Sequence, residues 1–444
     1  MTVPPPDTDW LARFAAATPA AVALVEDDGA EVTYRELNTL ADHAVGRLRD
    51  RGVAEGDVTP ISIGSVSRQL VALLWGAWRI GAAPAVMDQN SPLRAQWGTD
   101  LERIWNVGLA GSSTSPARLH TVVLTSGSGG DPRPVRISHS NVVAAVAASQ
   151  DRLGNTNNDR WLLILPLFHV GGLSILWRSA AAGGTVAIHD RFDPHRVARA
   201  IKSGSVSFAS LVPTMLYRLL EADPGPYEGM KGLLLGGAAA SRDLVEHGLD
   251  AGLPILQTYG MTETATQIAT VAPGEAFESL GTTGRPVEGM QVTTGGGGVG
   301  EIVVSGPAVS PGYLGEADRT GGHRTGDIGY LDEKGRLVVL GRADDMVITG
   351  GENVYPARVA DVLNAYQGFD RVEVVGVPDA EWGQVLVAVV VGDAESRGRI
   401  EQWAQQRLSR HEIPKQWAFV DTIPLQSGGK VDRVALFGIA MKAQ

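Results

Sequence analysis

Apolar residues recur at helical spacing in some segments and in short continuous runs in others, and the two kinds of segment alternate along the chain. Thr33 and Glu36 stand three residues apart ahead of the first helical segment, which is typical of a capping box. Helices are predicted over residues 37–48, 70–80, 142–149, 173–182 and 194–202, and strands over residues 58–63, 122–124, 162–165 and 185–188. Such alternation indicates parallel sheets covered by helices, with ligands beyond the carboxyl ends of the strands.

The pattern changes towards the carboxyl end. A glycine-rich stretch at 293–300 and a strand-like run at 301–304 indicate a hairpin in a more β-rich region, and a domain boundary is expected near 342–345. Further on, helices are predicted at 356–364 and 399–407 and strands at 372–377 and 385–391. The fold expected is α/β, with a large N-terminal domain of parallel-rich sheets and a β-rich subdomain over 1–343. A small mobile α+β C-terminal domain follows over 344–444.

Composition narrows the class of protein. The net charge of −11 argues against a nucleic-acid or anionic-membrane partner, because either would usually need a basic face. The absence of cysteine excludes disulfides, thiolate metal sites and a cysteine nucleophile. The first ten residues show no signal peptide, and the apolar stretch 161–177 is broken by Pro166, His169 and a glycine pair, so it indicates buried core. We expect a cytoplasmic protein, and a homodimer is left open.

The segment TSGSGGDPRPV, residues 125–135, is the most informative in the chain. It follows an apolar strand, and its hydroxyls and bare backbone N–H groups suit phosphate oxygens, with Arg133 as a fixed counter-charge. Neither a GKS or GKT ending nor the GxGxxG spacing is present, so it is not a Walker loop or a dinucleotide-binding turn. A mobile surface loop is the alternative.

Five later segments add candidate chemistry. LPLFHVGGL places His169 after a strand, where it lines a substrate pocket or is a satisfied core histidine. LLLGGAAAS ends a strand in small residues that would let a flat ring lie on the backbone. YGMTETATQ joins an aromatic ring, hydroxyls and a carboxylate able to hold Mg²⁺. Asp327, placed just before a predicted hairpin, suits two ribose hydroxyls, and Lys430 stands on a Gly-Gly turn where an ordinary lysine is simply solvated.

In this order and spacing the segments resemble the adenylate-forming superfamily of acyl-CoA synthetases, adenylation domains and luciferases, over residues 33–433. The resemblance implies ATP, Mg²⁺ and coenzyme A as substrates and cofactor, without a prosthetic group. It implies catalytic roles for Lys430, His169, Thr262 and Glu263, with Mg²⁺ on Glu263. It places the hinge at Asp344 and coenzyme A beside Gly350 and Gly351. The ATP-binding residues that it implies are Thr125, Ser126, Gly127, Ser128, Gly129, Gly130, Arg133, Gly236, Gly237, Ala238, Tyr259, Gly260, Met261, Thr262, Asp327, Arg342 and Lys430.

Two residues depart from the common phosphate-loop pattern TSGTTGxPKG. Gly129 replaces threonine, which is expected to weaken pyrophosphate contacts, and Arg133 replaces lysine, which keeps the charge and with it the use of ATP. The stretch between Asp88 and Thr121 is also shorter than in most members of the superfamily, so one peripheral element is expected to be missing.

Arg178 gives a clue to the acyl substrate, because it lies in the otherwise apolar segment 171–184, where a guanidinium is costly unless an anion meets it. The alternatives are an arginine that snorkels to the surface and one that pairs with a structural carboxylate. WLLILPLFHVGGLSILWR and YGMTETATQIATV are similar to the o-succinylbenzoate–CoA ligases of menaquinone synthesis. That resemblance implies a dicarboxylic substrate whose distal carboxylate meets Arg178, in a site lined by His169, Gly260, Thr266 and Gln267.

Other functions stay open at this point. They are a ligase for another aryl or acyl acid, a stand-alone adenylation enzyme of secondary metabolism that loads a carrier protein, and a non-catalytic nucleotide-binding regulator.

Overall fold

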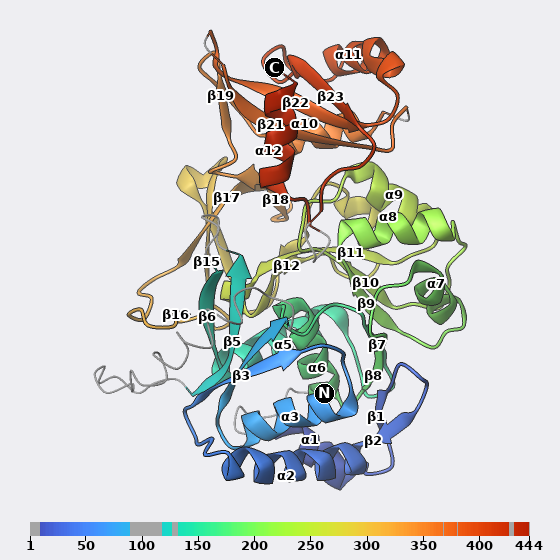
Figure 1. Ribbon diagram of the computed structural model, residues 1–444, viewed down its shortest axis with the longest axis vertical. Coiled ribbons are helices and arrows are strands. Elements are labelled where there is room, and N and C mark those ends of the chain that lie inside the picture. The colour runs from blue at the N-terminus through green and yellow to red at the C-terminus, as the bar shows by residue number, and fades with distance from the viewer. Residues whose placement is uncertain are drawn as a thin grey trace.

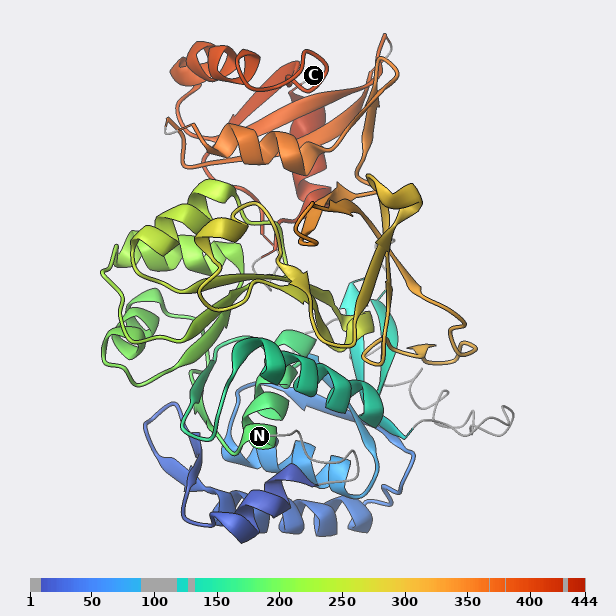
Figure 2. The same cartoon turned by 180° about the vertical axis from the view of Figure 1, so that it is seen from behind.

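The computed structural model describes residues 9–88, 118–126, 132–366, 368–379, 381–425 and 430–443, with backbone only for Ser126, Pro132 and Gly296. In these ranges the chain builds four sheets with flanking helices, stacked as a lower, a middle and an upper part (Figures 1 and 2). The upper part, in orange and red, holds the last sheet and the carboxyl end.

The largest sheet has nine strands in the order β13-β12-β11-β10-β9-β7-β8-β1-β2. Its central strands, from β11 to β1, run parallel, and antiparallel strands flank them at both ends. The bounds are β1 Val22–Val25, β2 Glu31–Thr33, β7 Arg160–Leu163, β8 Thr185–Ile188, β9 Phe208–Leu211, β10 Gly232–Leu235, β11 Ile255–Met261, β12 Thr266–Thr270 and β13 Arg285–Pro286. The parallel strands therefore open their carboxyl ends along one shared edge.

Three smaller sheets complete the fold. One has the order β16-β6-β5-β4-β3, with β3 Val58–Ile63, β4 Ala83–Asp88, β5 Leu119–Ser126, β6 Pro132–Ser138 and β16 Gly312–Tyr313. An antiparallel sheet joins β14 Gln291–Thr294, β15 Gly300–Ser305, β17 His323–Leu331 and β18 Leu337–Arg342. The last sheet joins β19 Val347–Thr349, β20 Glu352–Val354, β21 Arg371–Asp379, β22 Gly383–Val391 and β23 Gln416–Val420.

Helices cover the sheets and bury aromatic side chains between the layers. α5 and α6 contact strands of the largest sheet, and α5 also contacts β5 and β6, so these helices lie at the core of the lower part. Trp161 and Trp177 are among the largest fully buried side chains there. The α-helices are α1 Trp10–Ala17, α2 Tyr34–Asp50, α3 Arg68–Arg79, α5 His139–Leu153, α6 Val170–Ala182, α7 Pro194–Lys202, α8 Pro213–Ala222, α9 Arg242–Asp250, α10 Pro356–Asn364, α11 Arg397–Gln405 and α12 Arg433–Lys442, and the short 3-10 helices are η1 Thr262–Thr264, η2 Phe277–Ser279, η3 Gly295–Gly297 and η4 Ala394–Ser396.

The predicted α/β fold is confirmed, and so is the capping box. The Thr33 N–H donates to Glu36 Oε2 at 2.8 Å and the Glu36 N–H donates to Thr33 Oγ1 at 3.2 Å, which starts α2 three residues before the predicted helix. The stretch 161–177 lies largely in the core, as expected. The position of Asp327 is a correction, because it lies within β17 opposite Arg342 on β18 and not ahead of the hairpin. The missing-element prediction falls largely on residues 89–117, outside the described ranges.

The upper part contacts the middle part at two places. α10 packs near β18, and the Arg242 N–H at the start of α9 donates to Asp361 Oδ1 of α10 at 3.0 Å. The predicted domain boundary near residues 342–345 falls between β18 and β19, which belong to different sheets, and the division into domains stays a prediction.

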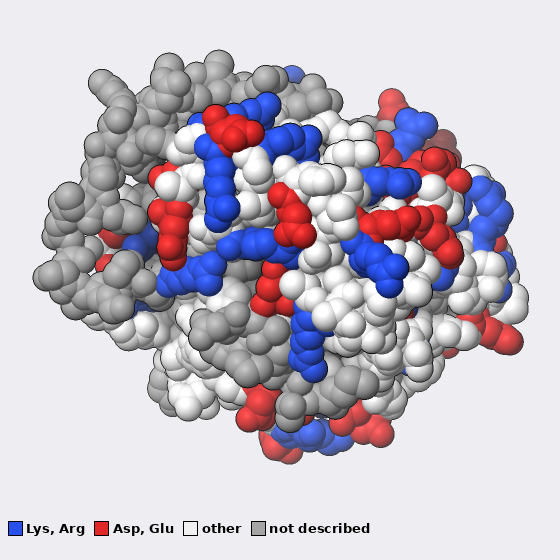
Figure 3. Space-filling model, turned by 90° about the horizontal axis from the view of Figure 1, so that it is seen from below, with Lys and Arg blue, Asp and Glu red and all other residues white. Residues whose placement is uncertain are grey.

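The lower face is mixed in charge. Viewed from below, basic and acidic side chains lie interspersed among uncharged ones (Figure 3). Within the described ranges, none of the helices combines the length and the apolar character needed to cross a bilayer.

Candidate functional site

The carboxyl ends of β10 and β11 carry two of the predicted nucleotide segments side by side. Leu235 pairs with Gln257, so the following Gly236–Ala238 stretch runs level with Thr258 and Tyr259. A Cβ on Gly236 would lie 2.7 Å from the Thr258 carbonyl oxygen, so only glycine allows this close approach. The small residues thus leave the backbone open beside the Tyr259 ring.

The turn that presents Glu263 is tightly built. β11 and β12 approach so closely that a Cβ on Gly260 would lie 1.8 Å from the Thr266 carbonyl oxygen. Ala265, buried between η1 and β12, adopts a φ of 53°, a conformation that L-residues rarely take and that often marks functional turns. Thr262 and Glu263 are therefore held on a short turn at the shared strand edge.

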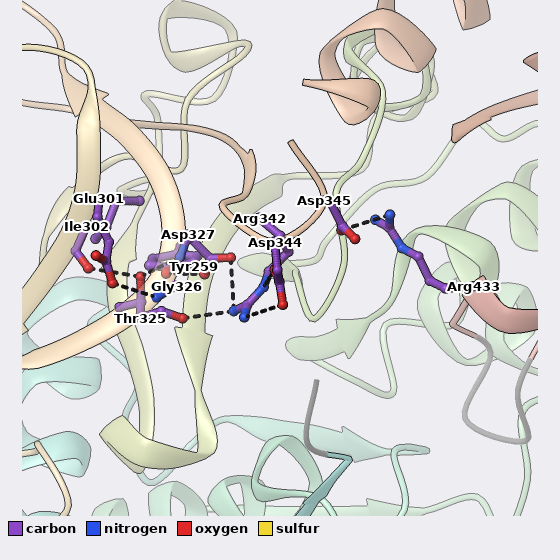
Figure 4. Close-up of polar contacts among 10 residues, drawn as sticks. All are labelled: Tyr259, Glu301, Ile302, Thr325, Gly326, Asp327, Arg342, Asp344, Asp345 and Arg433. Atoms are coloured by element: carbon purple, nitrogen blue, oxygen red, sulfur yellow. Dashed lines mark hydrogen bonds and ion pairs between the residues drawn. The ribbon is translucent and has the colours of Figure 1, made fainter. Parts of the chain in front are cut away.

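A line of polar contacts runs from Tyr259 to the predicted hinge (Figure 4). The Tyr259 hydroxyl donates to Asp327 Oδ2 at 2.5 Å, and Arg342 Nη1 lies 3.5 Å from Asp327 Oδ1. Arg342 Nε also donates to Asp344 Oδ1 at 2.9 Å, and its Nη1 donates to the Thr325 carbonyl at 2.8 Å. Burial raises the pKa of Asp327, against the effect of its two partners, while the Arg342 hydrogen bond lowers the pKa of Asp344.

A second line joins the phosphate loop to Glu263. The Arg133 guanidinium lies over the Tyr313 ring, with its carbon 3.4 Å from the ring centre, and pairs with Glu316 at 2.7 Å. The Tyr313 hydroxyl donates to Glu263 Oε1 at 2.9 Å, and burial raises the pKa of Tyr313 to about 12. Arg133 and Glu263, distant in sequence, are thus brought together by one tyrosine.

His169 and Lys430 converge although they belong to the lower and upper parts. His169 is the N-cap of α6, its side chain caps nothing, and its ring is exposed, so the interpretation as a core histidine is wrong. Desolvation, and after it the charge of Lys430, lower the pKa of His169 to about 4 against the opposing effect of Asp88. Desolvation also lowers the pKa of Lys430. His169 is therefore neutral at pH 7, and Lys430 lies within its electrostatic reach.

Arg178 is buried and faces no carboxylate within the described ranges. Its Nη2 donates to Ser174 Oγ at 2.9 Å, its guanidinium lies 5.0 Å from the centre of the Trp161 ring, and its Nη1 lacks a partner among the described residues. Burial lowers the pKa of Arg178 to about 9. Both alternative interpretations, a snorkelling arginine and one paired with a structural carboxylate of these ranges, are wrong.

The side chain of Arg178 points back towards the start of α6. Ser174, its partner, is one turn from Val170, about 6 Å along the helix axis, and its hydroxyl donates to the Gly171 carbonyl at 3.0 Å. The Arg178 guanidinium therefore lies one turn further towards the N-terminal end of α6 than its own Cα.

Known proteins resemble this chain in sequence and in fold. The AMP-binding enzyme family model matches residues 11–97 and 99–314, and the model of the AMP-binding enzyme C-terminal domain matches residues 358–430. The chain belongs to the AMP-binding enzyme family. Among its relatives, a 2-succinylbenzoate–CoA ligase of Listeria innocua is 32% identical, covering 96% of this chain and 98% of the relative. That of Bacillus licheniformis is 33% identical over the same shares.

Solved structures of family members share the fold of this chain. The o-succinylbenzoate CoA synthetase of Bacillus subtilis in complex with the acyl-adenylate OSB-AMP matches with a TM-score of 0.84 and 30% identity, covering 96% of this chain and 97% of that one. A double mutant of that enzyme bound with the product analogue OSB-NCoA covers the same shares with a TM-score of only 0.68. This AMP-binding enzyme is therefore arranged more like the adenylate complex than like the product-analogue complex.

Several predicted site residues are not tested by these contacts. Gly127, Ser128, Gly129 and Gly130 lie outside the described residues. Gly350 and Gly351 form the β19–β20 hairpin, where the Gly350 N–H donates to the Trp382 carbonyl at 3.1 Å. Gln267 is buried and donates to Thr270 Oγ1 at 2.7 Å, whereas Thr266 and Met261 are half-buried at the η1 turn. The roles predicted for them, and for Thr125, stay predictions.

Sequence reasoning missed four residues of this family site. Tyr313 and Glu316 bind Arg133, Asp88 ends β4 near His169, and Asp345 pairs with Arg433. The dipeptide Gly312-Tyr313 after a proline was a visible signal for Tyr313, and an aspartate ending a buried strand was one for Asp88. Nothing in the local sequence signals the pair of Asp345 with Arg433.

We predict that Asp327→Ala weakens AMP binding by about 10- to 100-fold, since hydrogen bonds to a charged group are lost. Tyr259→Phe, which removes one neighbour of Asp327, should weaken it by about fivefold or less. Isothermal titration calorimetry measures both. A dideoxy nucleotide, which lacks the ribose hydroxyls, serves as the control, and Asp327→Ala should leave its binding almost unchanged. An equal loss of affinity for both nucleotides would show that Asp327 does not bind the ribose hydroxyls.

Proposed function

We propose that this chain is an ATP-dependent carboxylate–CoA ligase that converts o-succinylbenzoate to its acyl-adenylate and then to the coenzyme A thioester, a step of menaquinone synthesis. The observation that carries the proposal is the approach of Lys430 to His169 at the strand edge that also holds Tyr259 and Glu263. Relatives named 2-succinylbenzoate–CoA ligase over nearly the whole chain support it. Because ATP and coenzyme A are cytoplasmic metabolites, we propose a cytoplasmic location.

The first half-reaction needs positive charge at two places. A carboxylate oxygen attacks the α-phosphorus, the bond to the pyrophosphate oxygen breaks, and pyrophosphate departs. Negative charge then builds on the α-phosphate while it leaves the carboxylate, and the mobile Lys430 ammonium is suited to meet both groups. Arg133 and the loop hydroxyls would hold the outgoing phosphates, and Asp327 with Arg342 would hold the ribose.

Glu263 suits Mg²⁺ because it is a hard oxygen donor on a rigid turn. Mg²⁺ is usually held by one or two carboxylates together with substrate phosphates, so a single protein carboxylate is sufficient. When bound, the ion neutralises phosphate charge; the Tyr313 hydroxyl, which donates to Glu263 Oε1, fixes the direction of that carboxylate.

In the second half-reaction the coenzyme A thiol attacks the acyl carbon and AMP leaves, which does not need the Lys430 ammonium. The buried Arg178 supports a substrate with a second carboxylate, because its Nη1 lacks a partner among the described residues and an anion would offset the cost of the buried charge. Neutral His169 would shape the site without attracting the reacting carboxylate away from the phosphate.

The experiment that tests this function is acid-dependent release of pyrophosphate by the full chain with ATP and Mg²⁺, across a panel of aryl and alkyl acids. We expect o-succinylbenzoate to give the highest kcat/KM, and added coenzyme A to yield its thioester, followed by mass spectrometry. If another acid gives a higher rate of pyrophosphate release, that acid is the better candidate for the substrate. If the adenylate is transferred only to a carrier protein, the acceptor is that protein and not coenzyme A. Absence of ATP turnover with every acid would favour a nucleotide-binding regulator.

Lys430→Ala should lower carboxylate-dependent pyrophosphate exchange by about 10²- to 10³-fold, because a cation aimed at transition-state charge is removed. Conversion of supplied acyl-adenylate to thioester should stay within about twofold of the unchanged enzyme, as it does not use the lysine. Lys442→Ala, at the exposed end of α12, is the control and should alter neither rate. Parallel loss of both half-reactions would contradict the role assigned to Lys430.

Arg178→Met keeps the length of the side chain and removes its charge. We expect the KM for o-succinylbenzoate to rise by about 10- to 100-fold, as a charge-assisted contact is lost, while a monocarboxylic analogue is used as before. Steady-state kinetics on both acids measure the difference, with Arg199→Met on the exposed side of α7 as control. If the KM rises equally for both acids, Arg178 has only a structural role.

A further inference from the structure

Two neighbouring carboxylates at the predicted domain boundary bind cations on opposite sides of it. Asp344 pairs with Arg342 of β18 at 2.9 Å, whereas Asp345 pairs with Arg433, the first residue of α12, at 2.8 Å (Figure 4). The first pair ties the boundary to the candidate ribose site through Asp327, and the second ties it to the segment that carries Lys430.

We propose that Asp345 and Arg433 are positioning residues, and that their ion pair seats the Lys430 segment over the candidate active site during adenylate formation. The proposal rests on the proposed function, since it concerns where Lys430 lies during the first half-reaction. Both residues act through Lys430.

Chain geometry makes Arg433 an effective anchor for Lys430. The two residues are three positions apart, and three peptide steps span at most about 11 Å between Cα atoms, so fixing the Arg433 guanidinium restricts the positions open to the lysine. An antiparallel β-bridge joins Leu425 and Val431, which lie before and after Lys430 in the sequence. This bridge further restricts the backbone that carries the lysine. In the arrangement that contains the Asp345–Arg433 pair, the charge of Lys430 acts on His169.

Electrostatics favour the pair at this position. Burial raises the pKa of Asp345, the Asp344 charge acts in the same direction, and Arg433 opposes both. Without Arg433, two adjacent carboxylates would share the single Arg342 guanidinium. About half of the Arg433 side chain is exposed, so the pair is of the modest kind that can open and close.

A separate contact keeps the upper part in place when this pair is removed. The Asp361 carboxylate of α10 accepts from the Arg242 N–H at the start of α9, where a negative charge also meets the positive end of the helix. Loss of Arg433 should therefore loosen the start of α12 and the Lys430 segment, while α10 keeps its contact with α9.

The kinetic test compares Arg433→Gln and Asp345→Asn with the unchanged enzyme in both half-reactions. We expect acid-dependent pyrophosphate exchange to fall by about fivefold, the range of a partly exposed ion pair, while supplied acyl-adenylate is converted to thioester at the same rate. The swapped variant D345K/R433E should recover most of the exchange. Arg397→Gln is the matched control, because the Arg397–Glu401 pair of α11 has the same distance and nearly the same exposure. Equal losses in both half-reactions, or a swap that recovers nothing, would overturn the proposal.

A second measurement does not depend on catalysis. The chain has no cysteine, so Arg218→Cys and Val434→Cys, both at exposed positions, can be labelled with a fluorophore pair. Without substrates, Arg433→Gln should broaden the energy-transfer distribution, whereas Arg397→Gln should leave it unchanged. An unchanged distribution with Arg433→Gln would refute the seating role even in an active ligase. If no acid is activated by the unchanged chain, the proposed function fails, and this measurement still decides whether the pair positions the segment.

Discussion

One guanidinium connects the candidate nucleotide site with the boundary between the lower and upper parts of the molecule. Arg342 lies between Asp327, which faces Tyr259, and Asp344, which stands where the last sheet begins. If one of these carboxylates loses its charge or moves away, the interaction of Arg342 with the other changes, because both pair with the same guanidinium. If Asp327 binds the ribose and Asp344 is the hinge, as the sequence predicts, a single side chain links the two.

The chain is acidic overall, and three of its cations are candidates for binding anions. The net charge is −11; Arg133 lies over the Tyr313 ring, Lys430 acts electrostatically on His169, and Arg178 is buried in α6. These cations differ in how they are held. Arg133 is held by Glu316 and Tyr313, Arg178 is buried with an Nη1 that finds no partner in the part of the chain that the structure describes, and Lys430 belongs to a different part of the molecule. Fixed cations suit phosphates and a distal carboxylate, whereas a cation on a separate part can arrive for one step and leave for the next.

Local patterns in the sequence predicted the elements well. Helices and strands such as α7, β3 and α10 have the predicted bounds, because capping residues, prolines and glycines mark their ends in the sequence itself. The order of motifs also predicted that Tyr259, Asp327 and Arg342 would meet. The partners of those residues were harder to predict. Tyr313 and Asp345 act across long separations, and their contacts depend on the pairing of β16 with β6 and on the placing of α12, which no local pattern encodes.

The strength of the boundary contacts fits the mobile C-terminal domain that the sequence predicts. A fully buried ion pair would hold the upper part firmly, since breaking it leaves an uncompensated charge. Asp345–Arg433 and Arg342–Asp344 are partly exposed, so water can replace each partner at little cost. The contrast with Arg178 is instructive, because that cation is buried. Under the proposed function, burial of Arg178 would serve discrimination between acids, and exposure of the boundary pairs would serve exchange between arrangements.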